Sequence, residues 1–548
     1  MLYDVIVVGS GIAGLAAAIR AGENYANVLL LTKNMPLRSN SSMAAGGINA
    51  SFANMEPDDY KAHLADTIKG GDGLVEERSA ATLTKNGVDV VSWLDGLGAN
   101  FDKDENGKIL QRAFGGAGKK RTCFVADKTG GAIVQAMIMS LKGKNIKVVS
   151  DYCVMSLLVD EERAAGVSAL NKKTCQIELF GAKSVVFAGG GYGGVYFGHT
   201  SNPLDSVGDL LSVALRAGLG LRDMEFMQFH PTGLWHSGSL VSEAVRGEGG
   251  YIVNAKGERF TNELATRDVL SRAIAREMEQ GGGVYIDVRH IDPQILEKRV
   301  PSFIRAAMSQ EGKDVTKELV PIKPVAHYSM GGIAVNEKCE TQIKGLYAAG
   351  ECACNGTHGA NRLGGNSLLE AAVFGRIAGE EAALYAKKQT TFLKADLTIV
   401  AKDEKRIENI LKGEAGANPR AVRKSLGDAM YKNVGLFRTE EGLMRGYEYT
   451  GYLKGVAGMM SAMEKKREGN FEVPFILELQ NAALIAEATV LAALKREESR
   501  GAHFRDDFGV RDDNRFKAHS MVKMDGMRLF HRFEERGVFA AIKHFIRR

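Results

Sequence analysis

Between residues 226 and 362 the sequence carries an unusual density of histidine and arginine, set beside glycine and other small residues. The side chains there that could do chemistry are His230, Thr232, Ser242, Glu243, Arg246, Arg267, His327, His358 and Arg362. One such histidine is more often a hydrogen-bonded core residue, and one such arginine more often belongs to a surface ion pair. The whole group is harder to explain in this way, because its small neighbours leave room for a ligand. Converging arginine and histidine donors suit a small dianion, since arginine binds a carboxylate through two parallel hydrogen bonds.

A dinucleotide site near the amino terminus could hold a cofactor beside this group. The stretch DVIVVGSGIAGLAAAIRAG, residues 4–22, is typical of a buried strand, a tight turn and a helix. Gly9, Gly11 and Gly14 form the pattern GxGxxG at the turn. Gly9 permits the tight turn, Gly11 lets the backbone approach a pyrophosphate, and Gly14 lets the helix pack closely on the strand. Unpaired N–H groups at the start of the helix would face the phosphates. The pattern alone is weak, but its strand and helix context predicts a bound dinucleotide.

The following strands favour FAD over a nicotinamide cofactor. The next strand, NVLLLTKN, ends at Thr32 and Lys33, where an NAD site usually has an acidic residue for the ribose. Two further strands end in small residues, AKSVVFAGGGYGGVY at residues 182–196 and GLYAAGE at residues 345–351. Backbone segments so far apart in sequence suit a long cofactor that several strand ends cross. A flavin beside a dianion site would carry out hydride transfer across a carbon–carbon or carbon–nitrogen bond.

Length and composition set the broad class. A chain of 548 residues with 45% hydrophobic and 25% charged residues is expected to form two to four globular domains. The net charge of +5 is too small to imply nucleic acid, and six scattered cysteines form no disulfide framework. The first strand begins at residue 3, so we expect no signal peptide. No uncharged apolar run reaches about 18 residues, so we expect no membrane span.

These segments predict an α/β protein with an insertion. We expect a Rossmann-like FAD-binding domain formed by residues 1–225 and 332–389, interrupted by an α+β capping domain at residues 226–331. A helical domain should follow at residues 390–500, because Leu477, Leu484, Leu491 and Leu494 share one helical face. In the remaining segment, 501–548, the basic stretch from residue 527 predicts a solvated amphipathic helix, with docking on a partner or on anionic lipid as the alternative.

Several motifs together resemble one family. HPTG, RGEGG, AHYSMGG, GLYAAGE, HGANRLGGNSL and ESRGAHFRDDFGVRDD are similar to segments of the flavoprotein subunit of succinate dehydrogenase and fumarate reductase. The resemblance extends from the first strand to about residue 520. It implies interconversion of fumarate and succinate by hydride transfer with FAD.

The resemblance also implies roles for residues of the histidine and arginine group. It implies that His230, His327 and Arg362 hold the substrate carboxylates, with help from Thr232 and Ser242. Arg267 would pass a proton to the substrate carbon, relayed from solvent through Arg246 and Glu243. Arginine hardly deprotonates in water, so a carboxylate clamp is the alternative role for Arg267. Exclusion of water when the capping domain closes over the site would make proton transfer from arginine less unfavourable.

For FAD, the resemblance implies a set of contacts from several segments. These are Gly9, Gly11, Gly14, Thr32, Lys33, Ser39, Gly46, Gly47, Asp209, Glu351, Asn366, Ser367 and Leu368. In most of the family the loop at residues 38–41 reads Arg-Ser-His-Thr, and its histidine is bonded covalently to the flavin. Asn40 stands at that place here. We therefore expect noncovalent FAD with a lower potential, which favours fumarate reduction; about 30 mV corresponds to about 1.4 kcal/mol.

Two other functions remain open at this point. L-Aspartate oxidase shares most of the motifs and also holds FAD noncovalently. It carries a glutamate before the glycine pair of QRAFGGAGKKRT, where this chain has Phe114 and would lack a partner for a substrate ammonium. A flavin-containing electron-transfer subunit without substrate chemistry is the third possibility, and the four residues His230, Arg267, His327 and Arg362 argue against it.

The expected partners follow from the cysteines and from the resemblance. Cys352 and Cys354 flank one alanine inside a strand end, which favours a structural role over a metal site. Because the sequence has no ferredoxin-like cysteine cluster, electrons must come from another subunit or a soluble donor. The resemblance implies an iron–sulfur subunit and a membrane-anchor or quinone-reactive subunit. The chain would then lie in the cytoplasm, peripheral on the inner face of the cytoplasmic membrane.

Overall fold

The computed structural model describes residues 2–24, 26–392, 397–414 and 416–534. Its largest sheet has seven strands in the order β6-β2-β1-β9-β8-β7, with β16 paired to β9. These strands are β6 (Ile146–Val149), β2 (Val28–Leu31), β1 (Leu2–Val8), β9 (Ile177–Phe187), β8 (Arg163–Asn171), β7 (Tyr152–Asp160) and β16 (Leu346–Ala348). The five strands β6, β2, β1, β9 and β16 run parallel. This is the predicted α/β fold class.

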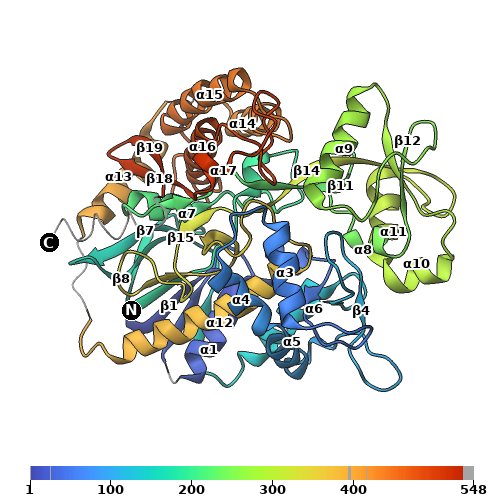
Figure 1. Ribbon diagram of the computed structural model, residues 1–548. Helices are drawn as coiled ribbons and strands as arrows, with labels where there is room; N and C mark the ends of the chain where they lie inside the picture. The colour runs from blue at the N-terminus through green and yellow to red at the C-terminus, as the bar shows by residue number, and fades with distance from the viewer. Residues whose placement is uncertain (1, 25, 393–396, 415, 535–548) are drawn as a thin grey trace.

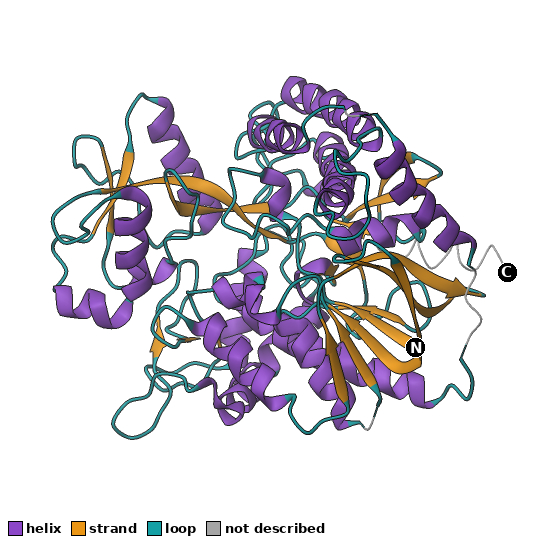
Figure 2. Cartoon of the chain, turned by 180° about the vertical axis from the view of Figure 1, so that it is seen from behind, coloured by secondary structure: helices purple, strands orange, loops and turns teal. Residues whose placement is uncertain are grey.

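The central strand β1 is covered on both faces, which explains why its sequence is a continuous apolar run. Val5 and Val7 belong to one hydrophobic core, and Ile6 and Val8 to another. Successive side chains of a strand point to opposite faces, so each face of the sheet has its own core. Figures 1 and 2 show helices on the two sides of this sheet.

The core that contains Val5 and Val7 lies on the side of the sheet where the dinucleotide turn leads into α1. Its main helices are α1 (Ile12–Glu23), α6 (Thr129–Ser140) and α12 (Asn366–Lys387). Smaller elements surround it: α2 (Asn40–Met43), α3 (Tyr60–Gly70), α4 (Glu77–Lys85), α5 (Gly87–Leu94), and the sheet of β3 (Ile48–Asn49), β5 (Thr122–Cys123) and β4 (Gln111–Arg112). Gly375 and Gly379 let α12 approach α1, because a Cβ there would lie 2.5 and 2.2 Å from carbonyl oxygens of α1.

A separate sheet with its own core stands apart from the large one, at the right of Figure 1. It is built from β11 (Met227–Leu234), β14 (Val320–Ser329), β13 (Val284–Asp287) and β12 (Tyr251–Asn254). Its helices are α8 (Glu243–Gly247), α9 (Arg267–Glu279), α10 (Pro293–Arg299) and α11 (Pro301–Ala306). Its core runs from Leu234 to Ile322 in the chain, which agrees with an inserted unit. The exact boundaries at 226 and 331 stay a prediction.

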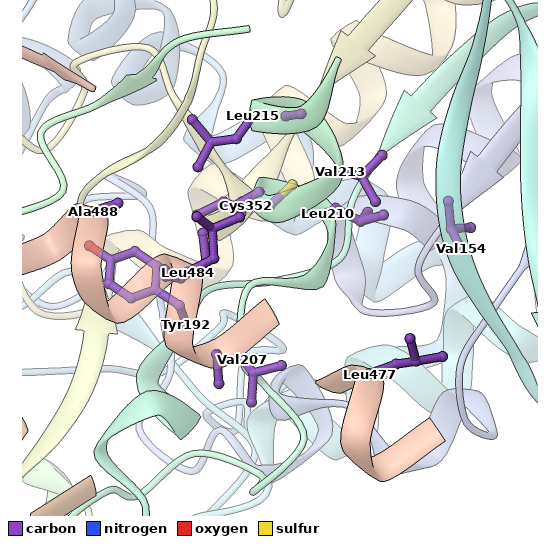
Figure 3. Close-up of a cluster of buried hydrophobic side chains, with 14 of the residues drawn as sticks. Val154, Tyr192, Val207, Leu210, Val213, Leu215, Cys352, Leu477, Leu484 and Ala488 are labelled. Atoms are coloured by element: carbon purple, nitrogen blue, oxygen red, sulfur yellow. The ribbon is translucent and has the colours of Figure 1, made fainter. Parts of the chain in front are cut away.

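The helical unit follows and shares a core with the large sheet. It contains α13 (Thr398–Lys412), α14 (Pro419–Asn433), α15 (Glu440–Gly458) and α16 (Glu472–Lys495). Figure 3 shows Leu477, Leu484 and Ala488 of α16 in one cluster with Leu210 of α7 (Asp209–Arg216) and Tyr192. Within the described residues α16 is the one helix long and apolar enough to cross a membrane, but 89% of its most apolar stretch is buried inside the protein.

The prediction of a helix from residue 527 was wrong for its first part. After α17 (Asp513–Phe516), the chain forms β18 (Ser520–Asp525) and β19 (Arg528–Phe533), which pair antiparallel. They extend a sheet of β17 (Ala353–Cys354), β15 (Gly332–Ala334) and β10 (Leu221–Arg222). In β19 exposed and half-buried residues alternate, the period of a strand with one covered face. Residues 535–548 lie outside the described residues.

Candidate active site

One cavity of about 650 Å³ passes along the carboxyl ends of the parallel strands. It is lined by the segments that follow β1, β9 and β16: residues 9–11, 188–190 and 349–351. Because β1, β9 and β16 are neighbours in the sheet, their ends meet at one edge, the usual ligand position in open α/β sheets. The three strand ends that the sequence singled out therefore line one site.

The glycines of the first turn are required by close backbone contacts. Gly9 has φ +108°, and a Cβ there would lie 2.2 Å from the carbonyl oxygen of Ala188. A Cβ on Gly14 would lie 1.9 Å from the carbonyl oxygen of Gly9, so Gly14 lets α1 pack on the turn and does not line the cavity. At the start of α1, the Ile12 N–H donates to Ser41 Oγ at 3.2 Å.

A cluster of charges closes one end of the cavity. Lys33 Nζ lies 2.7 Å from Asp209 Oδ2 and 3.3 Å from Glu478 Oε1 of α16. Burial alone would lower the pKa of Lys33, but Asp209 and Glu478 raise it well above its ordinary value. Lys33 is therefore a fixed cation at this end, and the helical unit contributes one of its partners. Thr32 lies beside it, with its hydroxyl 2.7 Å from Ser10 Oγ.

The loop at residues 38–47 lines the middle of the cavity, and Ser39, Asn40, Gly46 and Gly47 all contribute to the wall. Ser39 caps the short helix α2 by accepting from the Ser42 N–H at 3.3 Å. Phe114 is buried against this loop, since a Cβ on Gly46 would lie 2.8 Å from Phe114 Cζ. The ring also lies close to Gly364, where a Cβ would be 3.2 Å from Phe114 Cδ2 and 3.2 Å from Glu243 Oε2.

The other end of the cavity is formed by the inserted sheet and its helices. His230 on β11, His327 on β14 and Arg267 at the start of α9 line it together with Arg362, Ser242 and Glu243. The two histidine rings have centroids 4.9 Å apart. Residues that lie up to 132 positions apart, from His230 to Arg362, thus converge as the sequence predicted.

Arg267 is held by a fork of hydrogen bonds. Its Nη2 and Nε donate to Glu243 Oε2 at 2.8 and 3.1 Å, and its Nη1 donates to Gln228 Oε1 at 3.2 Å. Arg362 Nη2 donates to the same Gln228 oxygen at 3.0 Å. Burial would raise the pKa of the Glu243 carboxyl, but Arg267 and Arg246 hold it below its ordinary value. Glu243 is therefore an anion between two guanidinium groups.

Burial and the cationic neighbours at this end lower the pKa values of the remaining groups, Arg362, His230 and His327. Burial lowers the pKa of Arg362 to about 9, with Arg267 adding to the effect. Burial and Arg267 also lower the pKa values of His230 and His327 well below the ordinary value. Both imidazoles are therefore neutral near pH 7, and they can act as hydrogen-bond donors of one proton each. Arg362 also lies over the Tyr328 ring, 4.2 Å from its centroid.

Three predicted site residues have side chains that turn away from the cavity. Thr232 Oγ1 donates to the Val241 carbonyl at 2.8 Å, and Arg246 donates to the Glu263 carbonyl. Asn366 at the start of α12 bonds Asn49 and His63 in the interior. Arg246 nevertheless lies beside Glu243, with Nη2 3.9 Å from Oε2.

His358, in the original group, contacts the site only through other residues. Its Nε2 lies 3.3 Å from the Tyr328 hydroxyl, which in turn donates to Glu370 at 2.8 Å. The cysteines near Glu351 make protein contacts: Cys352 Sγ lies 3.2 Å from the Phe187 carbonyl and Cys354 Sγ lies 3.7 Å from Asp223. Across the described part of the chain, no group of three or more histidine, cysteine or acidic residues could hold a metal.

Comparison with known proteins identifies the architecture. Residues 4–368 match the model of an FAD binding domain, and residues 423–539 match that of the fumarate reductase flavoprotein carboxy-terminal region. The 8-methylmenaquinol:fumarate reductase flavoprotein subunit of Wolinella succinogenes is 39% identical over 545 residues, covering 95% of this chain and 88% of that protein. The succinate dehydrogenase flavoprotein subunit of Rickettsia bellii is 38% identical, with 95% and 93% covered. A structure of E. coli quinol fumarate reductase has 34% identity and a TM-score of 0.94, covering 98% and 97% of the two chains.

The chain belongs to the succinate dehydrogenase and fumarate reductase flavoprotein family. It is therefore an FAD-dependent oxidoreductase, and the predicted fold of FAD-binding, capping and helical domains is confirmed. The residues present fit FAD. Gly9 and Gly11 themselves carry no side chain at the turn, where the small hydroxyl of Ser41 is the nearest neighbour of Gly11, and one cavity is lined by both Lys33 and the arginine group.

Three further residues, Glu351, Ser367 and Leu368, line the cavity and would face the cofactor of this family. Burial raises the pKa of the Glu351 carboxyl to about 7, although the Ser329 N–H donates to it at 2.9 Å. Such a carboxyl can both donate to and accept from a sugar hydroxyl. Ser367 and Leu368, in the first turn of α12, also line the cavity. The positive end of that helix dipole therefore faces the cofactor site.

Sequence reasoning missed two side chains that hold the site together. Gln228 bonds Arg267 and Arg362, and Ser201 Oγ lies 2.7 Å from His327 Nδ1. Gln228 could have been found, because it stands two residues before His230 on the same strand and so shares its face. Ser201 gave no signal, since its loop is distant in sequence from His327 and contains no recognised motif.

Proposed function

We propose that this chain is the catalytic flavoprotein subunit of a complex that reduces fumarate to succinate. The observation that carries the proposal is the convergence of His230, His327, Arg267 and Arg362 on the cavity that the dinucleotide turn also lines. Two arginines and two neutral histidines supply enough donors for the two carboxylates of a C4 dicarboxylate. The chemistry that FAD supplies when bound is hydride transfer.

Each residue then has a distinct task. His230, His327 and Arg362 bind the carboxylates, Ser242 adds a hydroxyl, and these contacts hold the olefinic carbons in place. Arg267 donates the proton that the second olefinic carbon needs. Thr232 acts through His230, because its side chain turns away from the cavity.

The proton that Arg267 gives up must be replaced from outside the cavity. Glu243 accepts two hydrogen bonds from Arg267, and Arg246 stands on its other side. Nε and Nη2 of Arg246 are buried without a hydrogen-bond partner, so its guanidinium is free to exchange bonds. Glu243 and Arg246 therefore suit a relay toward solvent. If Arg267 serves instead only as a carboxylate clamp, its loss would raise KM more than it lowers kcat.

FAD is held noncovalently in this proposal. Asn40 occupies the loop position at which most of the family has a histidine, and its carboxamide is not a nucleophile. A noncovalent flavin has a lower potential, and this favours fumarate reduction over succinate oxidation. Lys33, Asp209, Glu351 and the turn glycines would hold the cofactor instead.

Fumarate is favoured over aspartate because of Phe114. The Phe114 ring is buried. The sequence resemblance implies that it corresponds to the glutamate that meets the substrate ammonium in aspartate oxidase. A cation–π contact would return about 0.5–2 kcal/mol, but a desolvated ammonium that lacks its hydrogen bond loses about 1–3 kcal/mol or more. Aspartate oxidation is therefore the second candidate function.

Electrons reach the chain from a partner in this proposal. The described residues contain no group that could hold a metal, so an iron–sulfur subunit would supply them. The names of the relatives, which include a menaquinol:fumarate reductase subunit, support a quinone-reactive membrane subunit as the third component. The chain would then lie in the cytoplasm against the membrane through its partners.

A substrate comparison tests the proposal. The purified, FAD-loaded chain should reduce fumarate with a low-potential artificial donor and should release little iminoaspartate from aspartate under air. Faster turnover of aspartate with oxygen would assign the chain to the oxidase. Absence of turnover with both, while FAD is bound, would favour an electron-transfer subunit.

A further inference from the structure

Ser201 lies in a loop that is tied to the strand carrying His327. The loop follows the single turn at Gly193–Tyr196, and Ser201 lines the cavity. The Ser201 N–H donates to the Ala326 carbonyl at 3.0 Å, and the Ala326 N–H donates to the His199 carbonyl at 2.9 Å. These backbone bonds hold the serine hydroxyl at a fixed place beside the histidine ring.

The hydroxyl of Ser201 has one proton and two acceptors within reach. His327 Nδ1 lies 2.7 Å from Oγ, and the Ala326 carbonyl oxygen lies 3.4 Å from it. That carbonyl already accepts from the Ser201 N–H and from Thr200 Oγ1 at 2.9 Å, so both of its lone pairs are used. The Ser201 proton therefore points at His327 Nδ1.

This bond decides which nitrogen of His327 carries the ring proton. Arg267 and Arg362 stand near the ring, and burial together with these charges keeps it neutral. A neutral imidazole has one N–H, and Nδ1 is here the acceptor. The proton is therefore on Nε2, and the ring lines the cavity.

His230 is arranged in the same way by a different donor. The Thr232 N–H donates to His230 Nδ1 at 3.2 Å, so its ring proton is also on Nε2. Two neutral rings with centroids 4.9 Å apart thus have one N–H each that can donate to a carboxylate oxygen. We propose that Ser201 is a positioning residue that fixes His327 as an Nε2–H donor to a substrate carboxylate. This inference rests on the proposed function.

Replacement of the serine tests the inference. In Ser201→Ala the ring can turn or change tautomer and present a lone pair to the carboxylate. We expect KM for fumarate and the dissociation constant for succinate to rise about tenfold, with kcat within about threefold of the parent protein and FAD content unchanged. Ser201→Thr keeps a hydroxyl donor and should restore values close to those of the parent. Such a split between KM and kcat reports lost ground-state binding and not a general loss of structure.

The controls separate the possible outcomes. Ser140→Ala removes a hydroxyl that donates to the Met137 carbonyl at 2.7 Å on α6, and Ser140 does not line the cavity, so this variant should behave as the parent protein. If Ser201→Ala fails to retain FAD, Ser201→Cys supplies a weak thiol donor of similar size and should give an intermediate KM. A KM for Ser201→Ala within twofold of the parent, or equal losses in the Ala and Thr variants, would overturn the role of Ser201 and leave the proposed function standing. A parent protein that neither reduces fumarate nor binds succinate would overturn both.

Discussion

Arg267 gives the sharpest test of the proposed chemistry, and Arg267→Lys is the informative change. The guanidinium makes three hydrogen bonds, two to Glu243 and one to Gln228. Lysine keeps the positive charge beside the buried Glu243 carboxylate, so the fold should survive. Removal of the charge in Arg267→Ala would instead leave that buried carboxylate with Arg246 as its remaining cationic neighbour, and loss of one partner of a buried ion pair costs about 3–5 kcal/mol. Lysine cannot reproduce the fork geometry, because a compact ammonium replaces a planar group with five donors.

The expected loss follows from the role assigned to the proton. A positioned general acid contributes about 10²–10⁴-fold to a rate. We therefore expect kcat for fumarate reduction to fall at least about a hundredfold in Arg267→Lys, which corresponds to about 2.7 kcal/mol in the barrier. FAD content should stay at the parental level, since Arg267 lies at the end of the cavity opposite Lys33.

Steady-state fumarate reduction with an artificial donor measures this loss, alongside flavin content. Arg276→Lys is the matched control: the same exchange on the same helix α9, at a half-exposed side chain that pairs with Asp506. Its kcat should be unchanged. Activity of Arg267→Lys within about tenfold of the parent protein would refute the proton-donor role. A large rise in KM with little change in kcat would indicate the carboxylate clamp.

Three further outcomes are expected. If FAD is held noncovalently, as proposed, acid denaturation and centrifugation should leave the yellow flavin in the supernatant, and a yellow precipitate would contradict the proposal. Phe114→Glu should weaken fumarate binding through like-charge repulsion, and an unchanged dissociation constant would show that this residue does not face the substrate. The Asp223 carboxylate, 2.5 Å from His519, overcomes the effect of burial and raises the pKa of His519 from 6.5 to about 9. The stabilisation by His519 should therefore be complete below about pH 6.5 and should disappear as the pH rises through about 9. The difference in Tm between the parent protein and His519→Gln should shrink over that range. A constant difference would contradict a charged His519.

Much of the cofactor site could be predicted, because local sequence determines it. The turn at Gly9 and Gly14 follows from steric contacts between neighbouring elements, and these have a recognisable spacing. The strand ends at residues 188–191 and 349–351 were also found, since buried parallel strands have continuous apolar sequences. These strand ends meet at one edge because the strands pair in parallel. The fold class alone is therefore enough to predict that they lie together.

The direction of individual side chains was harder to predict. In a regular strand Thr232 would share a face with His230 and would point into the cavity. The register of β11 shifts between His230 and Gly233, and this bulge turns Thr232 toward the Val241 carbonyl. Ser201 depends on a loop–strand contact that no local pattern specifies. The strand at Arg528–Phe533 was missed because its charged and aromatic residues suggested a helical face, and the period of two is seen only in the burial of the strand, where exposed and half-buried positions alternate.

The central claim is that this chain itself transfers electrons from FAD to fumarate, and a single turnover tests it most directly. The purified, FAD-loaded protein would be reduced chemically without oxygen and then mixed with one equivalent of fumarate. The account predicts that the oxidised flavin spectrum returns and that one succinate forms for each flavin, with a much slower return in Arg267→Lys. Flavin that stays reduced in the presence of fumarate, in protein whose FAD is fully bound, would contradict the account.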